Sequence, residues 1–156
     1  MYDSTTMAKY IVATANERGT PINITKTQKL LYIAYGVFLA VKGERLTDEH
    51  PKAWPYGPVF PRTRNKLLRQ DLYSINFNDK NLIGLKGDEE IKSLVGLVFD
   101  SFGEWTASQL TEWSHRDGTP WQRTVSSKAF DWGDTIPDEY IKPYFASIIK
   151  HDEAKQ

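Results

Sequence analysis

Apolar residues recur along most of the chain at the three- and four-residue spacing of helices. Met7, Ile11 and Ala15 lie about one helical turn apart, which predicts a helix over about residues 4–18. Gly19 follows at the place where a helix often ends in a left-handed conformation. The chain therefore opens with an amphipathic helix.

A second helix is predicted to open at Thr25 and to end at Gly43. Thr25 and Gln28 have the spacing of a capping box, in which each side chain pairs with a backbone N–H that has no helical partner. Apolar residues at positions 30–41 cover most of the circumference of this helix. We therefore expect it to lie at the centre of the domain, with other elements on several sides.

Four more helices are predicted in the second half of the chain. Their expected ranges are about 88–102, 107–115, 120–125 and 138–150. Capping-box spacings support the two short helices, through Thr106 with Gln109 and Thr119 with Gln122. Pro143 fits the last helix only if it lies near the first turn.

Residues 53–59, Ala-Trp-Pro-Tyr-Gly-Pro-Val, predict an ordered aromatic turn, because each proline forces the residue before it out of the helical region. Pro58 can then begin a short helix that continues to about Arg69. Residues 72–77 and 82–85, joined by polar residues, predict a small β-hairpin. The fold class is mainly α (α+β), one compact domain over residues 1–156 with six or seven helices around a central apolar helix.

Composition narrows the class of protein. The chain has 156 residues and no cysteine, which excludes disulfides, thiolate metal sites and cysteine nucleophiles and favours the cytoplasm. No targeting segment follows Met1. The apolar run at residues 30–41 is shorter than the roughly 20 residues that span a bilayer, so we expect no membrane contact.

The formal net charge of zero hides an asymmetry between the two halves of the chain. Residues 1–70 carry 11 basic and 5 acidic side chains, and residues 71–156 carry 9 basic and 15 acidic ones. If folding keeps these surpluses apart, they can steer a charged partner; if it brings them together, they form internal ion pairs.

No combination of residues in the sequence predicts catalysis. His50, His115 and His151 lack the second ligand at helical spacing that a metal site needs, and neither common phosphate-loop motif occurs, so we expect no metal and no cofactor. A hydrolase or transferase around His115, with Glu112 or Asp117 beside it, is the enzymatic alternative. Ser114 is a poor partner for it, because adjacent helical residues point about 100° apart.

Arg62, Lys66 and Arg69 lie on one face of the predicted helix 58–69, and no acidic residue occurs between positions 50 and 70. Such a face can contact nucleic acid, an acidic protein partner or only solvent. The aromatic rings of Trp54, Tyr56 and Trp121 stand beside prolines, which suits either a core or a rigid binding surface.

The order of three motifs resembles the Panacea domain of SocA-like antitoxins, also met as phage-associated proteins. These motifs are Gln-Lys-Leu-Leu-Tyr at residues 28–32, Ala-Trp-Pro-Tyr-Gly-Pro-Val at 53–59, and Ser-His at 114–115 followed by Gly-Thr-Pro-Trp at 118–121. The resemblance covers about residues 4–150. It implies a non-enzymatic antitoxin that neutralises a toxin encoded nearby by direct binding. The alternatives are an adaptor that delivers the toxin to a protease and a nucleic-acid-binding regulator.

The resemblance and the surface patterns together give two groups of site residues. The candidates for partner binding are Trp54, Tyr56, Arg62, Lys66, Arg69, His115 and Trp121. The candidates for a structural role in the motifs are Gln28, Lys29, Tyr32, Gly57, Pro58, Val59, Thr119 and Pro120.

Overall fold

A computed structural model describes the fold of residues 1–155 and the side chains of residues 1–150. The helices are α1 (Ser4–Arg18), α2 (Ile24–Lys42), α3 (Pro61–Leu67), α4 (Glu89–Phe102), α5 (Ala107–Ser114), α6 (Pro120–Val125) and α7 (Asp138–Lys155). Two short strands, β1 (Lys52–Trp54) and β2 (Gly57–Val59), pair antiparallel, and two 3-10 turns cover Leu72–Ser74 and Ile83–Leu85. The mainly helical class with a small hairpin is confirmed. No helix in the described part of the chain is long and apolar enough to cross a membrane.

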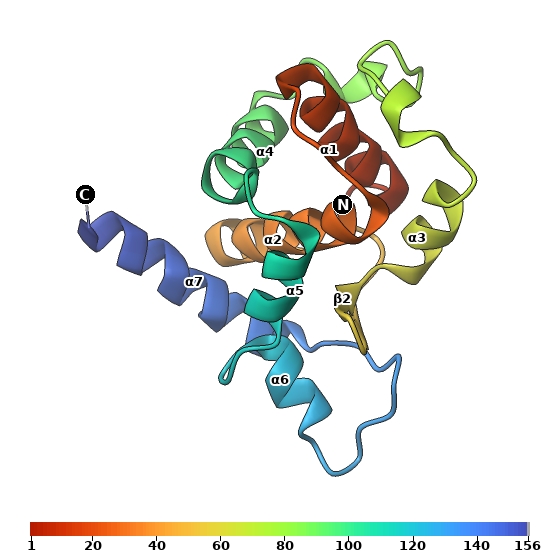
Figure 1. Ribbon diagram of the computed structural model, residues 1–156. Coiled ribbons are helices and arrows are strands. Elements are labelled where there is room, and N and C mark those ends of the chain that lie inside the picture. The colour runs from red at the N-terminus through yellow and green to blue at the C-terminus, as the bar shows by residue number, and fades with distance from the viewer. Residues whose placement is uncertain (156) are drawn as a thin grey trace.

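The central position predicted for the second helix is confirmed. Helix α2 is buried over most of its length and contacts α1, α3, α4, α5, α7 and β2 (Figure 1). Helix α7 packs against it at Gly36, where the Phe145 ring occupies the space that a side chain would need. Tyr32 packs edge to face against the same ring, with centroids 5.5 Å apart. One hydrophobic core therefore joins the N-terminal and C-terminal helices.

The hairpin prediction was right in kind and wrong in place. Residues 72–77 and 82–85 form no strand: 3-10 turns cover Leu72–Ser74 and Ile83–Leu85, with loops and turns between them. The side chains of Asp71, Asn76 and Asp79 favour turns here, because each accepts a hydrogen bond from the backbone N–H two residues ahead. The hairpin lies instead within the aromatic turn, with Lys52 opposite Val59 and Trp54 opposite Gly57.

Pro58 belongs to β2, so the prediction that it begins a helix was also wrong. Ala53 is its partner, and the N–H and C=O groups of Ala53 bond outward, to Asp134 and Gly133 at 2.9 Å each. The pair is thus a non-hydrogen-bonded one, in which the missing N–H of proline costs nothing. Ile136 N–H donates to Pro51 C=O at 3.0 Å, so residues 133–136 run along the free edge of β1.

Several helix ends differ from the prediction. Helix α2 begins one residue earlier, at Ile24, and Asn23 caps it by accepting from Lys26 N–H, so the expected box of Thr25 and Gln28 does not form.

The box of Thr106 and Gln109 is complete. That of Thr119 and Gln122 is half formed, because Gln122 Oε1 accepts from Gly118 N–H instead. Pro143 lies beyond the first turn of α7, where its exposed ring removes one helical hydrogen bond.

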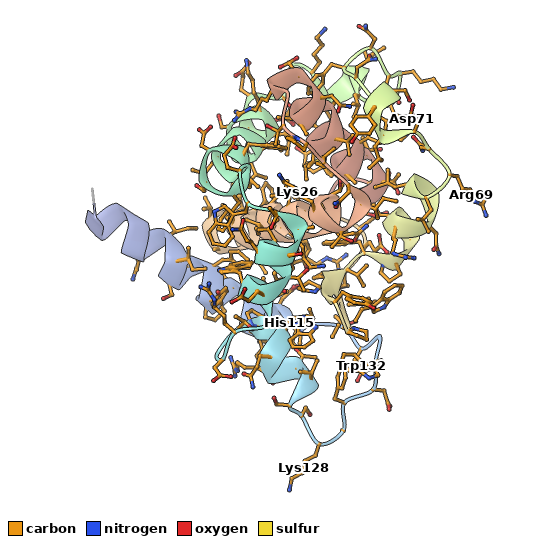
Figure 2. The ribbon with its side chains drawn as sticks, in the orientation of Figure 1. Lys26, Arg69, Asp71, His115, Lys128 and Trp132 are labelled. Atoms are coloured by element: carbon orange, nitrogen blue, oxygen red, sulfur yellow. The ribbon has the colours of Figure 1, made fainter. Side chains whose placement is uncertain are left out.

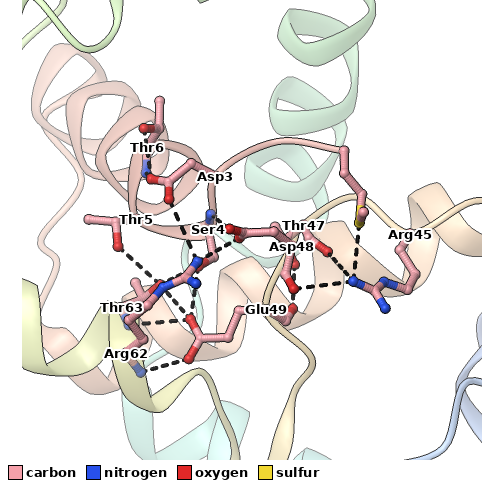
Figure 3. A network of polar contacts seen from close by, with 11 residues as sticks. Asp3, Ser4, Thr5, Thr6, Arg45, Thr47, Asp48, Glu49, Arg62 and Thr63 are labelled. Atoms are coloured by element: carbon pink, nitrogen blue, oxygen red, sulfur yellow. Dashed lines mark hydrogen bonds and ion pairs between the residues drawn. The ribbon is translucent and has the colours of Figure 1, made fainter.

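Helix α3 is shorter than the predicted helix 58–69 and starts on a carboxylate from elsewhere in the chain. Phe60, which precedes it, offers no side-chain cap. Glu49 replaces the cap, since its carboxylate accepts from Arg62 N–H at 2.6 Å and from Thr63 N–H at 3.3 Å (Figure 3). Ser4 Oγ donates to the same carboxylate at 2.8 Å, which ties α1 to the network.

Candidate partner-binding site

The three motifs converge on the hairpin. Lys29 of α2 is buried, and its ammonium group donates a hydrogen bond of 3.2 Å to the carbonyl oxygen of Pro58. Burial lowers the pKa of Lys29 to about 8. On the same helix, Gln28 Oε1 accepts from Phe60 N–H at 2.6 Å. Two adjacent side chains of α2 therefore hold the middle of β2 and the residue that follows it.

Gly57 is required at the turn by both backbone conformation and space. Its φ is 111°, a value that residues with a Cβ rarely adopt. A Cβ there would lie 2.7 Å from Ser114 Oγ and 2.9 Å from Lys29 Cε. The glycine lets the hairpin rest directly on α2 and α5.

His115 and Trp121 support the hairpin from below. Their rings stack with centroids 3.9 Å apart and 15° between planes, and Trp121 Nε1 donates to the carbonyl oxygen of Trp54 at 2.8 Å. Burial, and then the charge of Lys29, lower the pKa of His115. Ser114 Oγ donates to Thr111 C=O at 2.8 Å. This geometry does not pair Ser114 with His115 as a nucleophile and base.

Exposed aromatic rings gather at the end of the hairpin. Tyr56 is 75% exposed and Trp132, from the loop that flanks β1, is 58% exposed. Trp54 is half-buried, with the Arg64 guanidinium 5.5 Å above its ring. Figure 2 shows Trp132 beside the hairpin, and its ring lies 6.4 Å from that of Trp121. We call Trp54, Tyr56 and Trp132 the aromatic tip.

Sequence reasoning missed Trp132. It lies between Asp131 and Gly133 in a segment with no predicted helix or strand. A tryptophan in a polar, glycine-containing loop has no apolar face of an element through which to enter the core. That context was the available signal, because loops on a rigid scaffold often carry binding residues.

The structure separates the seven residues predicted to bind a partner. Trp54 and Tyr56 lie at the tip, His115 and Trp121 lie beneath it, and the three basic residues lie on or just after α3. Arg62 is engaged internally, with its guanidinium 2.6 Å from Asp48 and 3.6 Å from Asp3. Lys66 and Arg69 are exposed.

The residues predicted to have a structural role are largely buried. Tyr32, Gly57, Pro58, Val59, Thr119 and Pro120 join Gln28 and Lys29 in the interior. Thr119 Oγ1 caps α6 by accepting from Gln122 N–H at 3.3 Å, and Pro120 occupies the first position of that helix.

Several basic residues of the first half of the chain form ion pairs with acidic residues of the second half. Lys9 pairs with Asp79, Arg18 with Asp100 and Lys42 with Glu90, at 3.7, 3.0 and 3.3 Å. Within the described residues, no three histidine or acidic side chains lie close enough together to hold a metal ion. The folded chain thus carries less charge separation than its sequence suggests.

The fold and the site define a small α-helical domain that presents rigid aromatic side chains on a hairpin. The chain belongs to the family described as antitoxin SocA-like, Panacea domain, whose sequence model matches residues 27–122. It is 30% identical over 157 aligned residues to "Antitoxin SocA" of Caulobacter vibrioides (strain NA1000 / CB15N), which covers 92% of this chain and 82% of that protein. No solved structure matches the chain significantly.

Proposed function

We propose that this chain is a cytoplasmic antitoxin that neutralises a protein toxin encoded nearby by binding it directly through the aromatic tip. Its family and its similarity to Antitoxin SocA support the antitoxin role. The observation that favours the tip as the contact surface is the exposure of Tyr56 and Trp132. Helices α2 and α6 hold the hairpin that carries Tyr56, and backbone hydrogen bonds to Ala53 hold the loop that carries Trp132. A single exposed aromatic ring is ordinary, but several exposed apolar rings on one surface are typical of a protein interface.

The hairpin backbone that carries Tyr56 is held rigidly, which favours binding. Pro55 precedes Tyr56, and the hairpin backbone is fixed by Lys29, Gln28 and Trp121, so little backbone entropy is lost when a toxin covers the tip. Tyrosine and tryptophan each have two side-chain torsions and a large contact area, which is why they dominate protein interfaces. Arg64 adds a cation beside Trp54 that can pair with an acidic residue of the partner.

Affinity measurements with the product of the neighbouring gene test this assignment. We expect Tyr56→Ala and Trp132→Ala each to weaken toxin binding by about 2 kcal/mol and to reduce rescue of growth on co-expression. Tyr73→Ala is the matched control, because Tyr73 is 76% exposed and lies on the Leu72–Ser74 turn away from the hairpin. Equal effects of all three substitutions would contradict the proposal that the aromatic tip is the contact surface. A neighbouring product that is harmless and does not co-purify would remove the antitoxin role.

Direct neutralisation also predicts independence from proteolysis. An adaptor would need a cellular protease, so its protection would disappear in a strain that lacks that protease. We expect the wild-type chain to rescue growth and to leave the toxin level unchanged in such a strain. A fall of the toxin level that depends on this chain in the parent strain, which has the protease, would support the adaptor instead.

A further inference from the structure

A polar hollow of about 370 Å³ lies between α1, the end of α3 and the turn near residue 81. Thr5, Thr6 and Lys9 line it from α1, and Lys66 and Arg69 line it from the other side. Figure 2 shows Arg69 just after α3 at the right of the view, away from His115 and Trp132, which lie lower. We call this the Lys9 hollow. It shares no residue with the aromatic tip.

Lys9 is the central feature of the hollow. The residue is only 9% exposed, and its ammonium group lies 3.7 Å from Asp79 Oδ2, which is an ion pair but too long for a hydrogen bond. Asp79 is the acidic residue that pairs with this ammonium within the described residues. A largely buried ammonium with one long ion pair keeps N–H groups available, so an anion in the hollow would supply a further interaction.

The charges around the hollow favour an anion. Lys66 and Arg69 are exposed and form no ion pair within the part of the chain that the structure describes. The acidic residue of the lining, Asp3, is already engaged, since its Oδ2 accepts from Thr6 N–H and Oγ1 at 2.9 Å each and its Oδ1 lies 3.6 Å from Arg62. Three cations therefore line the hollow, and the two carboxylates near them, Asp3 and Asp79, are each engaged within the chain.

We propose that the Lys9 hollow binds a phosphate group, either free or carried by a small hydrophilic ester. Two ammonium groups, a guanidinium and nearby hydroxyls offer more donors than the two oxygens of a carboxylate can accept, and phosphate oxygens match that number. The volume lies near the lower end of the roughly 300–1,000 Å³ typical of small-molecule sites. The lining contains no aromatic ring on which a nucleobase could stack.

Titration of the full chain with inorganic phosphate and with ribose 5-phosphate, at constant ionic strength, tests the site. We expect saturable changes in backbone amide resonances at Thr5, Lys9 and residues 66–70. The double variant Lys66→Gln with Arg69→Gln, both on the surface, should weaken binding at least about tenfold, because each removes a charged hydrogen bond. Lys86→Gln with Lys92→Gln is the matched control, since it removes the same charge from exposed lysines of another hollow.

The outcomes separate the sources of the phosphate. Tighter binding of ribose 5-phosphate than of inorganic phosphate identifies an ester, and equal binding identifies the free ion. Resonance changes spread over unrelated lysines, or equal weakening by the control variant, would show screening alone and overturn the site. Duplex DNA that binds through Lys66 and Arg69 when neither small phosphate binds would also overturn it, in favour of a nucleic-acid surface.

Discussion

The ammonium group of Lys29 lies 3.2 Å from the carbonyl oxygen of Pro58, so a buried cation of the central helix holds the strand that leads away from the aromatic tip. Pro58 has no N–H, and its carbonyl points away from β1. Without Lys29 that carbonyl would face the interior unpaired, at a cost of about 1–3 kcal/mol. Lys29 thus fixes the hairpin at Pro58, the residue that makes no backbone hydrogen bond to β1.

This burial predicts an unusual pH dependence. Because the pKa of Lys29 is about 8 in the folded chain and 10.5 is its ordinary value, the unfolded state binds more protons between these values and stability rises with pH. We expect the free energy of unfolding to increase by about 1.5 kcal/mol between pH 8 and pH 9.5. Urea titrations should show this increase in the wild type and a smaller one in Lys29→Met, which keeps the contribution of Lys26, whose pKa burial also lowers. The buried tyrosines, whose pKa values are raised, act in the opposite sense only above their ordinary value of 10.

Substitution of Gly57 should be costly for two separable reasons. Gly57→Ala introduces both a strained φ and contacts with Ser114 and Lys29, and we expect it to destabilise the fold by about 3 kcal/mol. Gly118 has a φ of 85° but open space around it, so Gly118→Ala should cost only about 1 kcal/mol. Thermal or urea unfolding of both variants measures the difference. Equal losses would mean that the hairpin does not rest tightly on α2 and α5.

The crossing of α2 and α7 gives a second glycine prediction. A methyl group at Gly36 would overlap the Phe145 ring, so Gly36→Ala should destabilise by at least about 2 kcal/mol despite the higher helix propensity of alanine. Gly96→Ala, in α4, meets nothing closer than the end of the Arg18 side chain at 3.7 Å and should be neutral or stabilising by up to about 1 kcal/mol. Opposite signs in chemical unfolding are the expected result. Phe145→Leu should partly restore the stability of Gly36→Ala.

The cap of α3 can be removed without touching that helix. Glu49→Ala deletes acceptors for Arg62 N–H, Thr63 N–H and Ser4 Oγ, and we expect a loss of about 2 kcal/mol. Glu44→Ala removes the same charge from an exposed position and should change stability by less than about 0.5 kcal/mol. Hydrogen exchange should rise first at the amides of Arg62 and Thr63. Unchanged protection there would contradict the capping role.

Local signals predicted most of the helices, because the residues that decide a helix lie close together in sequence. Gly19, Gly43 and the box of Thr106 with Gln109 each end or begin a helix where expected. The start of α3 could not be predicted in the same way, since its cap, Glu49, comes from a loop more than ten residues earlier. The misplaced hairpin has a similar cause, because the strand that contains Pro58 is explained only by the pairing of Ala53 with residues 133 and 134.

The sequence pointed to several residues of the candidate site, but it could not predict which of their side chains are buried and which are exposed. Sequence reasoning grouped Trp54, Tyr56 and Trp121 as aromatic candidates and could not say which rings face solvent. Burial divides them, since Trp121 supports the turn from inside and Tyr56 stands outside. The basic residues predicted on one helix face also differ from one another. Arg62 forms an ion pair with Asp48, whereas Lys66 and Arg69 are exposed and unpaired within the described residues.

Both edges of the hairpin are occupied by the chain itself. Residues 133–136 cover the edge of β1, and the side chains of Lys29 and Gln28 satisfy the edge of β2. A partner that tried to extend this sheet by strand addition would first have to displace them. Under the proposed function, recognition at the hairpin would depend on side chains, so we expect exchange of residues 54, 56 and 132 to alter which partner binds while the backbone register stays the same.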